Sequence, residues 1–211
     1  MKTIVNRMSM RFKFACVLLL PLLALAWFAA QGIMERRATV QEFGRVHALT
    51  QLAQRAGDAV HQMQLERGMT AGFLGSEGET FGNRLNEQRP NTDAAAEAFQ
   101  AQRDELDQAL LTPAVTQQLN EIDAQWQRQT QLRKRVDNLD VTMGDALSHY
   151  TGINGQLMAF VGTLSHLTSE GDIARQLNAY EQLLEAKDLA GIERALLSNA
   201  FAADGMPTAM L

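Results

Sequence analysis

The sequence predicts an all-α protein, an antiparallel helical bundle of the four-helix-bundle type preceded by one N-terminal transmembrane helix. Ala, Leu, Gln, Glu and Met, which are good or fair helix formers, dominate the 211 residues, whereas the β-branched and aromatic residues that strands prefer are sparse. Apolar residues recur at three- and four-residue spacing, and an uncharged apolar run lies near the N-terminus. The single Cys excludes a disulfide scaffold.

The net charge of -5 argues against general nucleic-acid binding, so no nucleic-acid partner is expected. This average conceals a split. Residues 1–37 carry six basic side chains and one acidic side chain, a sum of +5, which leaves -10 for the rest of the chain. The basic excess therefore lies beside the apolar run.

The predicted membrane helix covers residues 14–34. Its uncharged core, Phe14 to Ala30, approaches the roughly 20 residues that span a bilayer, and a transmembrane helix can accommodate Pro21. The four basic residues before it predict a cytoplasmic N-terminus at 1–13. We therefore expect a protein of the inner (cell) membrane with a single N-terminal span and a periplasmic domain at 38–211.

A cleaved signal peptide is the alternative for the same segment. Ala24, Leu25 and Ala26 match a small-x-small cleavage site, and cleavage there predicts a free secreted domain. The apolar run continues through this site, and Arg36 and Arg37 follow within a helical pattern. These features favour the uncleaved anchor, but the alternative remains open.

The rest of the chain divides into helices joined by short turns. The first is a long amphipathic helix from Val40 to Leu74 that continues out of the membrane, followed by a loop from Gly75 to Asn91. Thr92 is expected to cap a helix that ends at Leu110. The remaining helices are expected to start at Thr112-Pro113, at Thr142 with Asp145 three residues later, and near Ile173, the last ending at Ala202. Short turns predict antiparallel neighbours.

Catalytic chemistry finds no support in the sequence. The four His residues are scattered, and no two have the four-residue spacing that directs both at one metal. A Gly-rich phosphate loop and a nucleophile elbow are also absent from the sequence. We expect no enzyme activity, no cofactor and no metal site.

Two segments depart from an ordinary helical pattern. In the first, Gln64 to Leu74, Gly68 and Gly72 interrupt a helix at a cost of about 1 kcal/mol each, and with Ala71 they form a strip that another backbone can approach closely. In the second, Glu185 to Ala195, small residues again share a face. The small residues of both segments are Gly68, Ala71, Gly72, Ala190 and Gly191.

Each segment also places an arginine, Arg67 or Arg194, next to its small residues. A guanidinium is a planar fork of donors that suits a planar oxyanion. The competing interpretation is that Arg67 forms an ion pair with Glu185 or Glu193 across the bundle, or with Glu66 and Glu193 as local surface partners. From the residues alone the ion pair comes first, and a helix crossing explains the glycines.

These segments, with Gln88-Arg89, Thr92-Asp93 and the stretch from Leu197 to Ala202, closely resemble the nitrate- and nitrite-sensing (NIT) domain. The resemblance covers roughly residues 49–204. It implies an all-helical sensor of bacterial membrane receptors, a kind of domain that also occurs in a few soluble regulators. It further implies that nitrate or nitrite binds through Arg67 and Arg194, with Arg89 and Lys187 as weaker candidates. It also implies a homodimer that signals through the membrane helix.

Two departures from the family pattern accompany this resemblance. The chain ends shortly after Phe201, where the family domain continues, so the domain is expected to be incomplete at its C-terminus. Met69 and Thr70 replace the Leu and Ser that are more frequent in the family. The sequence does not choose between nitrate and nitrite, and it names no output module. The alternative function is a membrane-tethered structural or protein-interaction bundle without a small ligand.

Overall fold

The computed structural model describes residues 10–202, and the side chains of residues 12–13, 15–17, 20, 38, 108 and 195–202 lie outside the described part. Residues 10–202 contain helices and no strand, which confirms the all-α class. The elements are α2 (Met10–Gly75), α3 (Gly82–Asp104), the short 3-10 helix η1 (Gln108–Leu110), α4 (Pro113–Asp137), α5 (Met143–Leu164) and α6 (Gly171–Ala202).

The chain divides into two compact units, Met1–Gly44 and Arg45–Leu211. In the first unit α2 exposes large apolar side chains, among them Leu22, Trp27 and Phe28. Over the part of the chain that the structure describes, no helix is both long enough and apolar enough to cross a membrane. The expected cytoplasmic N-terminus includes residues 1–9, which lie outside that part, and the side chains of residues 15–17 and 20 in the span expected at 14–34 also lie outside it.

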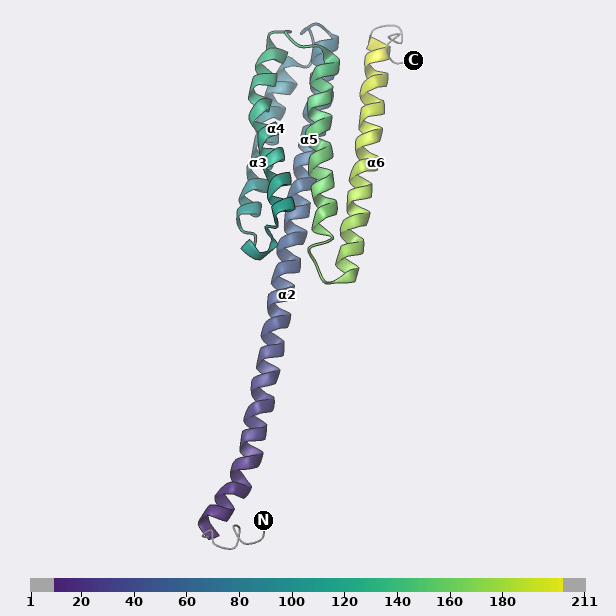
Figure 1. Ribbon diagram of the computed structural model, residues 1–211. Coiled ribbons are helices and arrows are strands. Elements are labelled where there is room, and N and C mark those ends of the chain that lie inside the picture. Colours follow the sequence, from purple (N-terminus) through teal and green to yellow (C-terminus); the bar gives the residue numbers. More distant parts are fainter. Residues whose placement is uncertain (1–9, 203–211) are drawn as a thin grey trace. The chain divides into compact units, whose positions relative to one another are not determined.

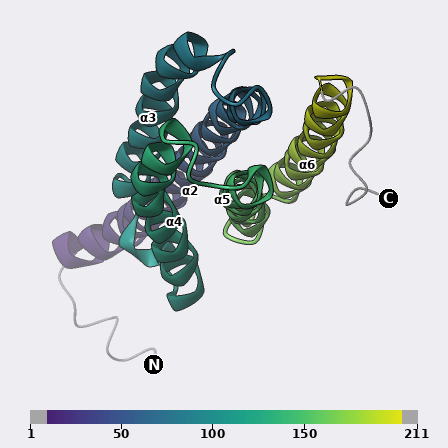
Figure 2. The same ribbon diagram turned by 90° about the horizontal axis from the view of Figure 1, so that it is seen from above.

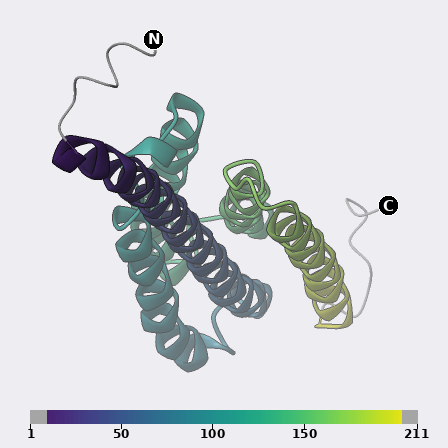
Figure 3. The ribbon, with the colours of Figure 1, turned by 90° about the horizontal axis from the view of Figure 1, so that it is seen from below.

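The second unit is a helical bundle in which α3, α4, α5 and α6 follow one another in alternating directions (Figure 1). Helix α5 packs against both α4 and α6, and views from above and below place α6 on the far side of α5 from α3 and α4 (Figures 2 and 3). The core contains Phe99, whose ring makes edge-on contacts with Trp126 and Phe160 at 5.6 and 5.8 Å between ring centroids. Helix α6 is therefore the peripheral helix of the bundle.

Local hydrogen bonding sets two helix starts as the sequence predicts. The Thr112 hydroxyl accepts from the Val115 backbone N–H at 3.3 Å, and Pro113 is the first residue of α4. The Thr142 hydroxyl accepts from the Asp145 backbone N–H at 3.1 Å at the start of α5. Both predicted N-caps are confirmed.

The predicted loop from Gly75 to Asn91 is wrong for most of its length. Helix α3 already begins at Gly82, continues through Pro90 and ends at Asp104, so Thr92 lies buried within it and does not cap it. Pro90 removes one backbone hydrogen bond. Its position on the exposed side of α3 allows water to hydrate the carbonyl that loses its partner, so the helix continues.

Candidate functional site

Two polar clusters lie on different sides of α2, because successive helical residues point about 100° apart. The Arg67 cluster comprises Gln64, Arg67, Thr151, Asn154 and Asp188 and joins α2 to α5 and α6. The Glu66 cluster comprises Glu66, Asp93, Gln129, Arg133 and Tyr150 and joins α2 to α3, α4 and α5.

In the Arg67 cluster a buried guanidinium holds a buried carboxylate. Arg67 is 2% exposed and Asp188 is 4% exposed. The pairing uses both ends of the fork, with Nη2 at 2.9 Å from Oδ1 and Nη1 donating to Oδ2 at 3.2 Å. Nη1 also donates to the Thr151 hydroxyl at 3.2 Å, and Nη2 donates to the Asp188 carbonyl at 3.4 Å. Arg67 thus binds a planar O–C–O group in a site closed to solvent.

Two neutral amides complete the surroundings of this carboxylate. Gln64 Nε2 donates to Asp188 Oδ1 at 2.9 Å, and Asn154 Nδ2 donates to the same oxygen at 3.2 Å. The other amide atom, Asn154 Oδ1, is buried and has no hydrogen-bond partner within the described structure. The cluster therefore offers several donors to one oxyanion and leaves one acceptor unsatisfied.

The second predicted arginine lies near this cluster in the chain but is solvent-exposed. A Cβ at Gly191 would lie 3.1 Å from Arg67 Nη2, so α6 runs against the guanidinium at that residue. Arg194 follows Gly191 by about one helical turn and is exposed. The structure brings Arg67 and Gly191 together and places Arg194 in solvent.

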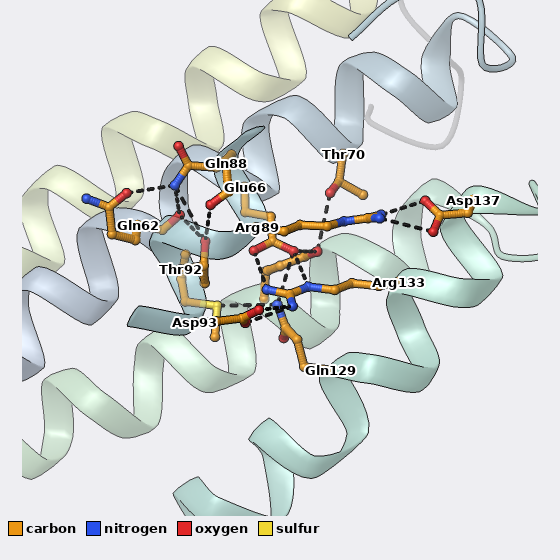
Figure 4. A network of polar contacts seen from close by, with 12 residues as sticks. Gln62, Glu66, Thr70, Gln88, Arg89, Thr92, Asp93, Gln129, Arg133 and Asp137 are labelled. Carbon is orange, nitrogen blue, oxygen red and sulfur yellow. Dashed lines mark hydrogen bonds and ion pairs between the residues drawn. The ribbon is translucent and has the colours of Figure 1, made fainter. Parts of the chain in front are cut away.

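The weaker candidates make other contacts. Lys187 Nζ lies 3.0 Å from His61 Nδ1 at the exposed edge between α2 and α6. Burial and the Lys187 charge lower the pKa of His61. Arg89 of α3 forms a two-point ion pair with Asp137 of α4, at 3.0 and 2.7 Å (Figure 4). Arg89 therefore joins α3 to α4 and is no part of the Arg67 cluster.

The small residues of the first segment do not form the strip that the sequence suggests. A Cβ at Gly68 would meet nothing within 4 Å, so no second helix among the described residues approaches there. A Cβ at Gly72 would lie 2.6 Å from the ring of Phe81, so this glycine makes room for a side chain. Ala71 is buried, whereas Ala190 in the second segment is exposed. Only Gly191 brings a helix against the arginine.

The Glu66 cluster holds a fully buried carboxylate (Figure 4). Arg133 donates from Nε to Oε1 at 2.8 Å and from Nη2 to Oε2 at 2.9 Å. The Tyr150 hydroxyl and Gln129 Nε2 donate to Oε1 at 2.9 and 3.3 Å. Burial and the Glu66 charge raise the pKa of Tyr150, which keeps the phenol protonated as a donor. The prediction of Glu66 as a surface partner is wrong.

The partner of Arg67 is neither Glu185 nor Glu193, the two partners predicted across the bundle, and both of these residues are exposed. Asp188 falls four residues after Leu184, on the stripe of α6 that faces the bundle, and this spacing is the signal that could have identified it. Glu66 likewise falls between Met63 and Thr70 on the buried stripe of α2. Charged residues on an apolar stripe are the ones that need a buried partner.

No group of three His, Cys, Asp or Glu side chains in the described residues is arranged to hold a metal ion. Among solved structures, the chain is similar to one described as the NasR transcription antiterminator, with a TM-score of 0.76 and 24% identity. The match covers 88% of this chain and 49% of that chain, so this chain spans about half of that protein's length. This likeness shows a shared fold. No curated protein sequence matches the chain.

A family model described as nitrate and nitrite sensing, NIT, matches residues 58–211. The match begins in α2 shortly before Arg67 and extends past both small-residue segments, which confirms the resemblance that the motifs indicate. It covers well over half of the chain. The protein therefore belongs to the nitrate and nitrite sensing (NIT) family.

Proposed function

We propose that this chain is the ligand-binding portion of a nitrate or nitrite receptor and that the anion binds to Arg67 between α2, α5 and α6. The observation that carries this proposal is the planar carboxylate that Arg67 already holds at both ends of its fork. Nitrate, which is trigonal planar, and nitrite, which is bent, each present a planar O–N–O edge similar to the O–C–O edge of a carboxylate. A guanidinium that binds one such edge offers matching donors to the other.

Burial of Arg67 supports the same assignment. Charge-assisted hydrogen bonds contribute about 1.5–3 kcal/mol each, and exclusion of water strengthens them. Two such bonds and the neutral donors of Gln64 and Asn154, beside the Thr151 hydroxyl that accepts from Arg67, are sufficient for roughly micromolar affinity, about 8 kcal/mol, after the cost of association. Arg194 is the second cation of the proposal; it lies in solvent about one helical turn after Gly191, so it reaches the anion only when α6 changes position.

The proposal includes a membrane anchor at residues 14–34, with 1–13 in the cytoplasm and 38–211 in the periplasm. The uncharged run from Phe14 to Ala30 and the exposed Leu22, Trp27 and Phe28 support it, because an apolar surface of this kind requires an apolar environment. α2 carries both this segment and Arg67, which makes it the proposed path of the signal. We propose that the receptor acts as a homodimer, as the family resemblance implies.

Calorimetric titration of the full chain with nitrate, nitrite and chloride tests the ligand. We expect saturable heat with nitrate or nitrite, a loss of affinity of at least about 100-fold in Arg67→Ala, and a smaller loss in Arg194→Ala. Arg67→Lys keeps the charge without the fork and should recover little of the affinity. Arg89→Ala is the matched control, since Arg89 binds Asp137 on another side of the bundle and should leave affinity unchanged.

A folded wild-type chain that gives no heat with either anion would contradict the receptor and leave a structural or protein-interaction bundle. Equal losses in Arg67→Ala and Arg89→Ala would contradict the site. Protease accessibility of residues 38–211 in intact and in permeabilised cells, with the protein in the membrane fraction, tests the anchor and its orientation. Recovery of the chain in the soluble fraction would contradict the anchor, and cleavage after Ala26 would show the signal peptide.

A further inference from the structure

The structure is that of a site whose anion position is already filled by the chain's own carboxylate. Asp188 binds both Nη atoms of Arg67, at 2.9 and 3.2 Å, and both residues are closed to water. An incoming oxyanion that uses the same two donors cannot share them with Asp188. Adding a second anion beside Asp188 would also place a net negative charge in a buried site, which is costly without a further partner.

We propose that Asp188 is a tethered competitor for the anion, and that binding replaces its carboxylate in a shell formed by Arg67, Gln64, Thr151 and Asn154. This inference rests on the proposed function and assigns to it a competitor and three neutral ligands. Gln64 and Asn154 already donate to the oxygen that Arg67 binds, at 2.9 and 3.2 Å. An oxyanion in the place of the carboxylate meets the same donors.

When Asp188 occupies the anion position, one buried polar atom of the cluster lacks a hydrogen-bond partner among the described residues. Asn154 is fully buried, and its Oδ1 has no hydrogen-bond partner in the described part of the chain. A buried acceptor without a donor raises the free energy of the state that contains it. The carboxylate-filled state is therefore less stable than one in which Asn154 Oδ1 has a donor; nitrate and nitrite carry no donor, so relief of this penalty requires a protein group or water that moves in when the cluster rearranges.

The exchange changes how α6 is held. Asp188 is the residue of α6 that accepts from Gln64 and Arg67 of α2 and from Asn154 of α5. Near it, Lys187 contacts His61 at an exposed edge, where a polar contact contributes little. Release of the Asp188 carboxylate therefore breaks the buried ion pair and hydrogen bonds that hold this peripheral helix at Asp188. Anion binding then displaces α6 relative to α2 and α5.

Asp188→Asn in the full chain tests the competitor. The substitution keeps the size of the side chain, turns one acceptor oxygen into an N–H donor and removes the charge that competes for Arg67. We expect nitrate to bind at least about tenfold more tightly than to the wild type, because an amide is the weaker partner of a guanidinium. Asp137→Asn is the matched control: it removes the carboxylate that holds Arg89 and should leave nitrate affinity unchanged. Asn154→Ala and Gln64→Ala should each weaken binding several-fold.

The outcomes separate this inference from the proposed function. If wild type and Asp188→Asn are both folded and neither binds nitrate or nitrite, the proposed function fails. If the wild type binds nitrate through Arg67 while Asp188→Asn binds with equal or lower affinity, the competitor is refuted and the receptor stands. Circular dichroism of each variant establishes that it is folded.

A measurement that leaves Asp188 intact covers the case in which Asp188→Asn does not fold. Spin labels on His61→Cys and Lys187→Cys, with Cys16→Ser, report the separation of α2 and α6 at two exposed positions. We expect saturating nitrate to shift the distance distribution, and saturating chloride to leave it unchanged. An unchanged distribution in a chain shown by calorimetry to bind nitrate overturns the displacement of α6.

Discussion

Glu66 and Arg67 are neighbours in α2, yet the clusters they form differ in which charges are buried and in how many carboxylates surround the guanidinium. In the Glu66 cluster the anion is fully buried, and Arg133 lies at the edge, where it also binds the exposed Asp93 at 2.7 Å. In the Arg67 cluster the cation and its single carboxylate are both buried, and every other partner is neutral. The first contains two carboxylates for one guanidinium, whereas the second contains one of each.

This difference explains why an anion is expected at Arg67 and not at Arg133. A cavity of about 170 Å³ lies beside Arg133, but Asp93 and Glu97 are among its lining residues. An anion in that cavity would face carboxylates on α3 and a guanidinium already neutralised by Glu66. At Arg67 an anion has one competitor among the described side chains, Asp188, which belongs to the peripheral helix.

The largest expected effect compares the two guanidiniums directly. Arg133→Met leaves the Glu66 carboxylate buried without its cation and should lower the free energy of unfolding by about 3 kcal/mol. Arg67→Met should cost less, because α6 can move and allow Asp188 to reach water. Urea unfolding followed by circular dichroism measures both. Equal losses would show that the Arg67 cluster is as fixed as the Glu66 cluster.

A smaller effect is expected from Tyr150→Phe. The variant removes the hydroxyl that donates to Glu66 and accepts from Thr70, and it should lower the free energy of unfolding by about 1–2 kcal/mol. Nitrate affinity should not change, since Tyr150 makes no contact with the Arg67 cluster in the described hydrogen-bond network. A parallel loss of nitrate affinity would mean that the two clusters are energetically coupled.

Substitutions of the glycines that follow Glu66 and Arg67 should have smaller effects on the free energy of unfolding. Gly68→Ala should raise the free energy of unfolding by about 0.5–1 kcal/mol, because the new methyl group meets nothing within 4 Å and alanine favours the helix. Gly72→Ala should lower it, because the methyl group would collide with the Phe81 ring. The same unfolding experiment measures both. A destabilised Gly68→Ala would indicate a close approach to α2 in solution.

The smallest effect concerns pH at the Glu66 cluster. Burial and the Arg128 charge lower the pKa of His149 below its ordinary value of 6.5, and His149 Nε2 lies 3.1 Å from Gln129 Oε1. The unfolded chain therefore binds this proton more readily than the folded chain. The contribution of neutral His149 to the free energy of unfolding is complete above pH 6.5. It declines as the pH falls from 6.5 to the lowered pKa of His149 in the folded chain. His149→Gln should make the loss of stability over this range shallower, and identical slopes would contradict the assignment.

The sequence predicts the features of this fold that depend on local chemistry. Thr112 and Thr142 cap helices because their hydroxyls reach backbone N–H groups three residues away, which requires nothing from the rest of the molecule. The start of α3 is different. Its glycines and Pro90 indicate a loop by local rules, but packing of Leu85 and Gln88 into the bundle outweighs these preferences.

The candidate site is predictable to a similar extent. Arg67 stands out because it lies beside glycines within a motif, whereas Asp188 is one of many acidic residues on an amphipathic helix. To distinguish Asp188 from Glu185, one must know which face of α6 is turned toward the bundle. Tertiary packing determines that face. The position of Arg194 in solvent and the burial of Glu66 depend on the same rotations. Periodicity indicates which face is buried but not which partner lies opposite.

The adjacency of Glu66 and Arg67 has a mechanical consequence for the helix that bears them. Two buried ion pairs extend from one turn of α2 in directions about 100° apart, so together they fix the rotation of this turn about the helix axis. Rotation of this turn about the helix axis in either direction separates both side chains from their ion-pair partners. Deletion of one residue before Glu66 would point both side chains away from those partners. If one ion pair breaks, the other still fixes this turn together with the buried Met63 and Thr70, but one of the two restraints on its rotation is lost.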